Sequence, residues 1–305
     1  MNGSTSFRNS LLEEANRVKG VYYPVRAGFL RRVLVKKTAC SKLHPNPDDE
    51  FCFPEIGPND GIISGYEQDY RRILDGSASM EFIQSGIKEP LMVEKTRPDG
   101  YMILNGHHRW AAAKRVGIKK LRIKIVDLTQ LKDIREMLKS SGSDKRVSLD
   151  LDEVVFRPAE DSCLEKPLRF PLNRFYRERI RLGIPALFHA LNSQGYDIWI
   201  YTARYYSFSY LKYYFKHYRV PVTGIVTGTA RKGPFSRDTL KEMERLFDAK
   251  YRETIHIDQN TILCTSKGSH DFEEYRLNGS SESWSREVME TIDRRRKGEQ
   301  ANRPG

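Results

Sequence analysis

Two aspartates separated by one residue, Asp150 and Asp152, lie within the apolar stretch Arg146–Phe156. In a buried strand alternate residues share a side, so both carboxylates would point one way and Leu149 and Leu151 the other. Two acids held close together repel, and one tends to ionise while the other keeps a proton near neutral pH. The pair could therefore supply a nucleophile or metal ligand beside a general acid/base. A solvated acidic turn at a strand end explains the pair alone about equally well.

Three later segments repeat this arrangement, in which an apolar run ends in polar residues. They are Asp197–Thr202, Gly224–Thr227 with the loop that holds Lys232, and Thr254–Asp258, and Thr261–Cys264 is a candidate fifth strand. Strands alternating with helices predict an α/β fold with a doubly wound parallel sheet, which is Rossmann-like. Carboxylates from separate strand ends can hold magnesium, and a hydroxyl and a lysine can hold phosphate oxygens. Asp150 would then be placed for in-line attack on phosphorus.

The order of these residues resembles the haloacid dehalogenase (HAD) superfamily of aspartyl-phosphate phosphohydrolases across most of residues 145–265. The resemblance implies that Asp150 is the nucleophile and Asp152 the general acid/base, with the main-chain carbonyl of Asp152 also on the metal. It further implies that Thr202 hydrogen-bonds the phosphoryl group, that Lys232 neutralises the intermediate and that Asp258 binds Mg²⁺. Lys241 and Lys250 are nearby alternatives to Lys232.

The insert between Asp152 and the next predicted helix is on the order of thirty residues, which is too short for a large cap domain. The resemblance therefore implies a minimal cap and an open site. Arginines of the insert could line its rim and attract anions, although a basic surface without specificity is about as consistent with the pattern. They are Arg157, Arg169, Arg174, Arg177 and Arg179.

The earlier half of the chain has its own candidate site, where a predicted hairpin strand runs into Asn105-Gly-His-His-Arg109 and an alanine-rich helix ending at Gly117. Asn105 can cap the helix, Gly106 allows close backbone approach, and a helix N-terminus attracts anions. His107, His108 and Arg109 would surround a phosphate with donors. A basic helix start packed on its core is the plainer alternative.

This motif, its helix and the strand Leu121–Val126 resemble the ParB/sulfiredoxin-like α+β fold, and the free-serine kinase branch in particular. The resemblance implies that a glutamate of the proline-containing loop activates a substrate hydroxyl, which points to Glu50 first and Glu55 second. Asn105 stands where those kinases carry an aspartate, and His107 stands where sulfiredoxins carry a cysteine. Nucleotide (ADP or ATP) or phosphate binding is therefore expected here ahead of catalysis.

Charge and composition bound the remaining choices. The net charge is +12 over 305 residues, which favours anionic partners such as phosphates, nucleotides or nucleic acid. The N-terminus lacks the apolar core of a signal peptide and no apolar run could span a membrane, so a cytoplasmic protein without a membrane partner is expected. The four cysteines are far apart, which favours free thiols.

The polar, serine-rich stretch Ser140–Asp144 is the segment most typical of a linker between two domains. We expect the domain boundary near Ser143. We thus expect a ParB/sulfiredoxin-like domain over 20–140, a HAD-like domain over 145–290 and a basic flexible tail over 291–305. The leading hypothesis is an Mg²⁺-dependent phosphohydrolase acting on a small or macromolecular phosphorylated substrate. A nucleotide-dependent kinase of a small hydroxyl compound, such as an amino acid, and a ParB-like nucleic-acid-binding protein are the alternatives.

Overall fold

The computed structural model describes all residues except 1, 19, 29–30, 33, 78–85, 230–233, 269–271, 280–281 and 302–305. The chain forms two compact units, Met1–Leu128 with Arg231–Thr239, and Thr129–Ala230 with Leu240–Gly305. The boundary therefore precedes the one expected at Ser143. The Ser141 hydroxyl donates to Asp197 at 2.6 Å and the Ser143 hydroxyl to the Gly195 carbonyl at 2.5 Å, so this stretch is tied into the second unit.

The first unit contains a mixed sheet with strand order β2-β6-β4-β5-β3, in which β1 pairs with β4. The strands are β1 (Tyr23–Pro24), β2 (Lys36–Ala39), β3 (Leu43–His44), β4 (Leu91–Arg97), β5 (Tyr101–Asn105) and β6 (Lys120–Ile125). The helices whose bounds lie within the described residues include α1 (Asn2–Val18), α3 (Asp60–Leu74) and α5 (His107–Val116). Alternate residues of β4, β5 and β6, among them Val93, Ile103 and Ile123, pack with Trp110 of α5 in one core.

The predicted hairpin is confirmed, because β4 and β5 pair antiparallel. The described residues just before β2 do not belong to the sheet. Arg31 and Arg32 are helical and β2 begins only at Lys36, while residues 29, 30 and 33 lie outside the described part. The Arg32 guanidinium is bound to Asp127 at 2.5 Å, a contact 95 residues away that no local pattern reveals.

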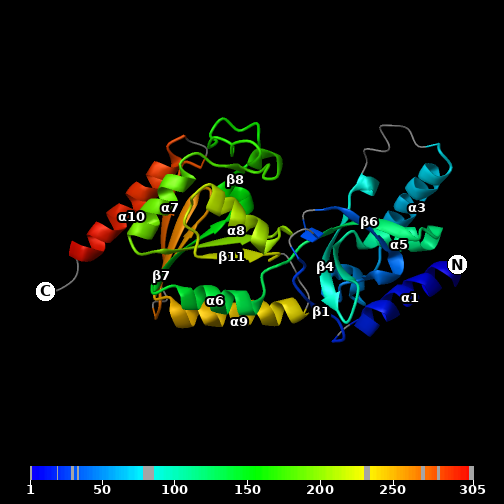
Figure 1. Cartoon of the computed structure of the whole chain (residues 1–305). Helices are drawn as coiled ribbons and strands as arrows, with labels where there is room; N and C mark the ends of the chain where they lie inside the picture. Colours follow the sequence, from blue (N-terminus) through cyan, green and yellow to red (C-terminus); the bar gives the residue numbers. More distant parts are fainter. Residues whose placement is uncertain are drawn as a thin grey trace. The chain divides into compact units, whose positions relative to one another are not determined.

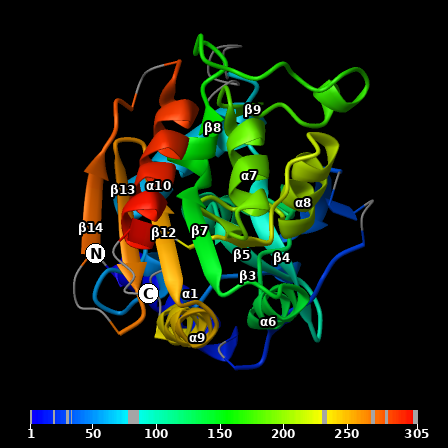
Figure 2. The same ribbon diagram turned by 90° about the vertical axis from the view of Figure 1, so that its left-hand side faces the viewer.

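The second unit contains a sheet with strand order β11-β10-β7-β12-β13-β14. Figure 2 shows the part of this sheet from β7 through β12 and β13 to β14. Its strands are β7 (Lys145–Asp150), β10 (Asp197–Thr202), β11 (Gly224–Thr227), β12 (Glu253–Ile257), β13 (Thr261–Ser266) and β14 (Phe272–Arg276). The first four in spatial order are parallel, as predicted. β13 and β14 are antiparallel, so the sheet is mixed. A small separate hairpin joins β8 (Phe156–Arg157) to β9 (Arg179–Ile180).

Helices cover both faces of this sheet (Figure 1). They are α6 (Leu131–Ser140), α7 (Ile184–Ser193), α8 (Phe208–His217), the part of α9 (Pro234–Lys250) from Leu240 onward, and α10 (Trp284–Ala301). Val147 and Ile198 pack in one core with residues of α7, α8 and α10, whereas Trp199 packs in another with residues of α6 and α9. The alternation along β10 thus buries both faces, which explains its continuous apolar run.

Within the described part of the chain, α9 begins at Pro234. Proline is favoured in the first helical turn, where its missing N–H has no partner to lose. Within the described ranges, every helix is too short or too polar to cross a membrane.

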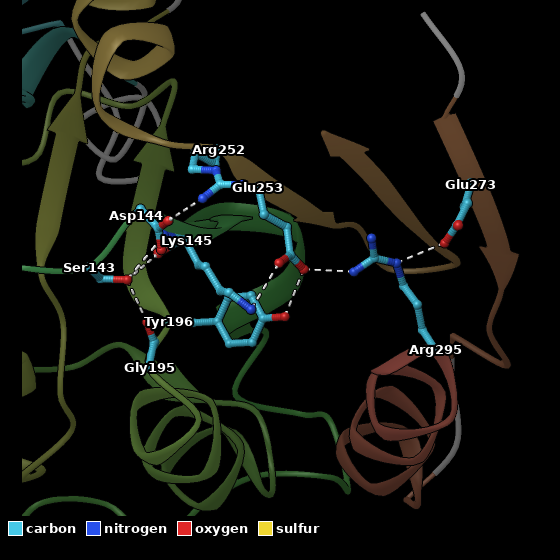
Figure 3. Close-up of polar contacts among 9 residues, drawn as sticks. All are labelled: Ser143, Asp144, Lys145, Gly195, Tyr196, Arg252, Glu253, Glu273 and Arg295. Carbon is cyan, nitrogen blue, oxygen red and sulfur yellow. Dashed lines mark hydrogen bonds and ion pairs between the residues drawn. The ribbon is translucent and has the colours of Figure 1, made fainter. Parts of the chain in front are cut away.

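A polar network joins the amino ends of β7 and β12 to α10 (Figure 3). Glu253 accepts from the Tyr196 hydroxyl at 2.8 Å and from Arg295 at 2.6 Å, and Lys145 lies 3.2 Å from the same carboxylate. Arg295 also donates to Glu273 at 2.7 Å. The network stands at the edge of the sheet opposite to Asp150, so it supports the fold at a distance from the candidate site.

Candidate functional site

Asp150 ends β7 and caps the π-helical turn that follows it, Leu151–Val155. One carboxylate oxygen, Oδ1, accepts from the backbone N–H groups of Asp152 at 2.7 Å and Glu153 at 2.9 Å. Asp152 therefore belongs to a turn, and the expectation that strand periodicity aligns the two acids is wrong. The turn brings them together instead, while Leu149 and Leu151 are buried as predicted.

Asp152 is bound to the end of the neighbouring strand. The Thr202 hydroxyl, which is completely buried, donates to Asp152 Oδ2 at 2.6 Å and accepts from the backbone N–H of Arg204 at 3.1 Å. Asp152 Oδ1 is buried without a hydrogen-bond partner among the described residues, and its ion-pair partner is Arg204 Nε at 3.3 Å. The structure thus brings Asp150, Asp152 and Thr202 together at the carboxyl edge of the sheet.

Asp258 follows β12 at the same edge. Ile257 pairs with Leu149, so Asp258 comes next at the level of Asp150 on the neighbouring strand, and neighbouring strands lie about 4.8 Å apart. Its carboxylate accepts only a local bond, from the Gln259 N–H at 2.7 Å, among the contacts described. Across the described residues, no three His, Cys, Asp or Glu side chains are arranged to hold a metal ion.

The lysine expected at this site has no described position, because Lys232 lies outside the described residues. Of its two alternatives, Lys241 is exposed on α9, and Lys250 donates to the Ser141 carbonyl at 2.6 Å. Sequence reasoning missed Arg204, which contacts Asp152. Its position two residues after the strand end at Thr202 was the available signal.

The arginines expected to line the rim divide into two groups. Arg157 pairs with Asp161 at 2.8 Å, and Arg179 donates to the Glu165 carbonyl at 2.9 Å, so both hold the insert together. The remaining three are exposed, namely Arg169, Arg174 and Arg177.

The histidines of the first unit do not have the donor role expected of them. His107 is 4% exposed, and its Nε2 accepts from the Asn46 N–H at 3.1 Å. Burial lowers the pKa of His107 to about 4, against the opposing effect of Asp49. His108 Nε2 likewise accepts from the Asn59 N–H at 3.2 Å, and burial lowers its pKa. Both neutral rings therefore fix loops that precede α3.

The rest of this motif is also structural in the contacts described. Arg109 is buried and donates to the Glu89 carbonyl at 2.8 Å. Gly106, with φ of 99°, is the N-cap of α5, so the cap expected from exposed Asn105 is wrong. A Cβ on Gly106 would lie 2.3 Å from Leu91 Cδ2, so both the backbone angle and the space require glycine here.

The proline-containing loop contributes to a pocket of about 950 Å³ in the first unit. Its lining includes Asp48, Glu55 and Glu94 among mainly apolar side chains, while Glu50 is exposed on a short 3₁₀ turn and is not in the lining. Of the two glutamates considered, the second choice, Glu55, thus faces the pocket.

Comparison with known families identifies one region. Residues 70–142 match the ParB N-terminal domain, which confirms the predicted ParB-like character for this part of the chain. The matched region contains the Asn105–Arg109 motif. Among curated proteins, none matches the chain significantly.

Three solved structures show weaker likeness. The C-terminally truncated chromosome-partitioning protein ParB from Caulobacter crescentus, complexed with CTP-gamma-S, is 21% identical over 35% of this chain, with a TM-score of 0.23, and the match spans 60% of its length. A mutant free serine kinase in complex with AMP is 14% identical over 78% of both chains, with a TM-score of 0.22. A conserved hypothetical protein from Pyrococcus furiosus is 15% identical, with coverage of 85% of this chain and 100% of that one and a TM-score of 0.21. At these TM-scores the likenesses carry no further argument.

Proposed function

We propose that the second unit is an Mg²⁺-dependent phosphohydrolase of the HAD type that works through an aspartyl-phosphate on Asp150. One observation carries the proposal: Asp150, Asp152 and Thr202 meet at the carboxyl edge of a parallel sheet, with Thr202 Oγ1 2.6 Å from Asp152 Oδ2. Such edges are where α/β sheets place their ligands.

The reaction follows from the two carboxylates. The turn holds Asp150 through Oδ1, which leaves the other oxygen to attack phosphorus while the bond to the leaving oxygen breaks. Asp152 gives its proton to that oxygen. In the second step water attacks the same phosphorus, Asp152 takes a proton from the water, and inorganic phosphate and the free Asp150 carboxylate are released. Thr202 and Arg204 orient Asp152 for both transfers.

The residues at this edge suit a magnesium ion. Asp150, Asp258 and the main-chain carbonyl of Asp152 offer only oxygen donors, and magnesium is commonly held by one or two carboxylates together with water and substrate phosphate. Such a set does not require three acidic side chains in one group. When bound, the ion would neutralise charge on the phosphoryl group.

Replacing Asp150 with asparagine tests the proposal. Hydrolysis of p-nitrophenyl phosphate in the presence of Mg²⁺ should fall by at least about a thousandfold, because an amide does not attack phosphorus and nucleophile loss is among the largest catalytic defects. Asp144→Asn is the matched control, since Asp144 is exposed and precedes the same strand at its other end. Full turnover in Asp150→Asn would end the proposal.

A second candidate, nucleotide binding by the first unit, is favoured by the ParB N-terminal match over residues 70–142. The resemblance of the Asn105–Arg109 motif to the ParB/sulfiredoxin-like fold implies nucleotide or phosphate binding at this motif. The structure supports a backbone site more than a side-chain site, since His107 and His108 already accept loop N–H groups. Titration calorimetry with CTP, ATP, ADP and AMP tests it, and heat for none of the four would exclude it.

Two extensions of this candidate can be tested in the same preparation. Phosphorylation of a small hydroxyl compound such as an amino acid would implicate Glu50 or Glu55, and a screen with ADP and ATP would detect it. ParB-like DNA binding would show a steep loss of affinity with added salt. Absence of binding at low salt would exclude it.

A further inference from the structure

The insert between the π-helical turn and α7 exposes large aromatic side chains. Phe170 is 69% exposed and Phe175 is 60% exposed, and Tyr213 of α8, on the helix against which the insert packs, is 44% exposed. Exposed aromatic rings that gather on one surface commonly mark a binding site.

Arginines alternate with these rings. Arg169 precedes Phe170, Arg174 precedes Phe175, and the Arg174 guanidinium lies 5.1 Å from the centroid of the Phe170 ring. Between residues 157 and 181 the sequence has seven basic residues against four acidic ones. Among the contacts described, no carboxylate pairs with Arg169, Arg174 or Arg177, so their charge is available to an anion.

The insert is joined to α8 by a tyrosine. The Tyr210 hydroxyl donates to the Phe175 carbonyl at 3.3 Å and also bonds the Glu178 carboxylate, and its ring centroid lies 4.9 Å from that of Tyr176. These bonds hold the backbone beside Phe175 in place while the phenylalanine ring itself remains exposed.

Tyr210 also lies near residues of the candidate active site. The Tyr210 ring stacks on Tyr206 with centroids 6.2 Å apart, Tyr206 comes two residues after Arg204 in the chain, and Arg204 pairs with Asp152. Side-chain contacts and a short piece of chain thus connect Asp152 with the insert, and a substrate whose phosphate reaches Asp150 can extend along this surface.

We propose that the substrate of the second unit is the phosphorylated end of a single-stranded nucleic acid, whose bases stack on Phe170 and Phe175 and whose backbone phosphates pair with Arg169, Arg174 and Arg177. The proposal rests on the phosphohydrolase function above: hydrolysis adds water to the terminal phosphomonoester and releases a hydroxyl end and inorganic phosphate. Stacking on aromatic rings together with arginine contacts to the backbone is how single strands are bound without sequence preference.

An anionic membrane is the competing partner, and the sequence of the insert disfavours it. Membrane-binding segments present a continuous apolar face, whereas each exposed phenylalanine here is next to an arginine and Glu178 lies three residues after Phe175. The alternation suits a polymer that itself alternates bases and phosphates.

The test measures binding separately from turnover. Fluorescence anisotropy of a labelled oligonucleotide of about ten nucleotides without a terminal phosphate, titrated with the full chain, reports the surface alone. The double variant Phe170→Ala/Phe175→Ala should weaken binding about twentyfold or more, since each stacked base contributes about fivefold or more. Phe272→Ala is the matched control, because Phe272 is 64% exposed on β14 and away from the insert.

Charge is tested in the same way. Arg174→Gln should weaken binding and reduce its salt dependence, whereas Arg245→Gln, at an 80% exposed side chain on α9, should leave both unchanged. Circular dichroism verifies that each variant is folded. Equal affinity of the insert variants and their controls, no binding at low salt, or binding to phosphatidylserine vesicles that oligonucleotides do not compete away would each overturn the inference. In that case the proposed phosphohydrolase function would survive if the wild-type chain hydrolyses p-nitrophenyl phosphate. If the wild-type chain does not hydrolyse it, the phosphohydrolase proposal itself is wrong.

Discussion

Thr202 Oγ1 lies 2.6 Å from Asp152 Oδ2, although the two residues are 50 positions apart in the chain. The contact joins the end of β10 to the turn that follows β7. It gives the general acid of the proposed reaction a fixed orientation, because one oxygen is held by the hydroxyl and the other faces Arg204.

Removing the Thr202 hydroxyl should therefore slow turnover. Thr202→Val keeps the volume of this fully buried side chain but loses the hydrogen bond, and kcat should fall about tenfold to a hundredfold. Thr202→Ser retains the hydroxyl and should keep most of the activity. Steady-state kinetics with p-nitrophenyl phosphate compares the two, and equal rates would show that the hydroxyl does not orient the acid.

Magnesium removal should abolish phosphatase turnover, and added Mg²⁺ should restore it. Asp258→Asn should raise the Mg²⁺ concentration for half-maximal activity by about tenfold or more, because an amide oxygen is a weaker ligand for a hard cation than a carboxylate. Asp248→Asn, on the exposed side of α9, is the control. An unchanged Mg²⁺ requirement in Asp258→Asn would remove this residue from the metal site.

His107 should make stability depend on pH. Its pKa of about 4 in the folded chain lies below the ordinary value of 6.5 because burial disfavours the charged ring, so between these values the unfolded state binds more protons. The contribution of neutral His107 to the free energy of unfolding is fully present above pH 6.5 and is lost as the pH falls toward 4. Its total is about 3 kcal/mol.

His107→Gln isolates this contribution, since glutamine does not titrate and can still accept the Asn46 N–H. Urea unfolding at several pH values between 7.5 and 4.5 should give a flatter pH profile for the variant than for the wild type. His44 and His108, whose pKa values are also lowered by burial, are retained in both proteins. Parallel profiles would contradict the buried neutral state of His107.

The network in Figure 3 supplies a stability test with its own control. Arg295 is 5% exposed between Glu253 and Glu273, and Arg295→Leu should cost about 3 kcal/mol because it removes the charged hydrogen-bond donor from the Glu253 carboxylate, whose side chain is only 12% exposed. Arg252 is 81% exposed and lies 3.8 Å from Asp144. Arg252→Leu should therefore lower the free energy of unfolding by less than about 1 kcal/mol. Similar unfolding free energies for the two variants would contradict the network's role.

The strand ends could be predicted from the sequence, because each strand of a buried parallel sheet is a short apolar run and its polar end is local information. Asp150, Thr202 and Asp258 each stand at such a polar end, and the register between β7 and β12 brings Asp258 to the level of Asp150. The π-helical turn after Asp150 could not be predicted from the strand pattern. The turn is held by the Asp150 carboxylate, which accepts from the Asp152 N–H, whereas strand periodicity describes only which side of the sheet a residue faces.

The motif at residues 105–109 shows where prediction from sequence fails. Histidine can donate or accept, and the choice depends on partners that are distant in sequence. Asn46 and Asn59 supply N–H groups from loops 61 and 49 residues away, which turns both rings into acceptors. Long-range polar partners likewise hold two other segments whose local pattern does not reveal them. Arg32 bonds Asp127, and Ser141 bonds Asp197.

The position of α10 has a consequence for synthesis of the protein. Trp284, Val288 and Ile292 are each buried in the main core of the second unit, and Arg295 completes the bonds of Glu253. Because α10 follows every strand of this sheet in the chain, a ribosome must translate as far as Ile292 before this core can close. We expect nascent chains that stop ahead of Trp284 to leave an apolar face of the sheet uncovered and to depend on chaperones. By that stage β7, the strand that carries Asp150, has already left the ribosome.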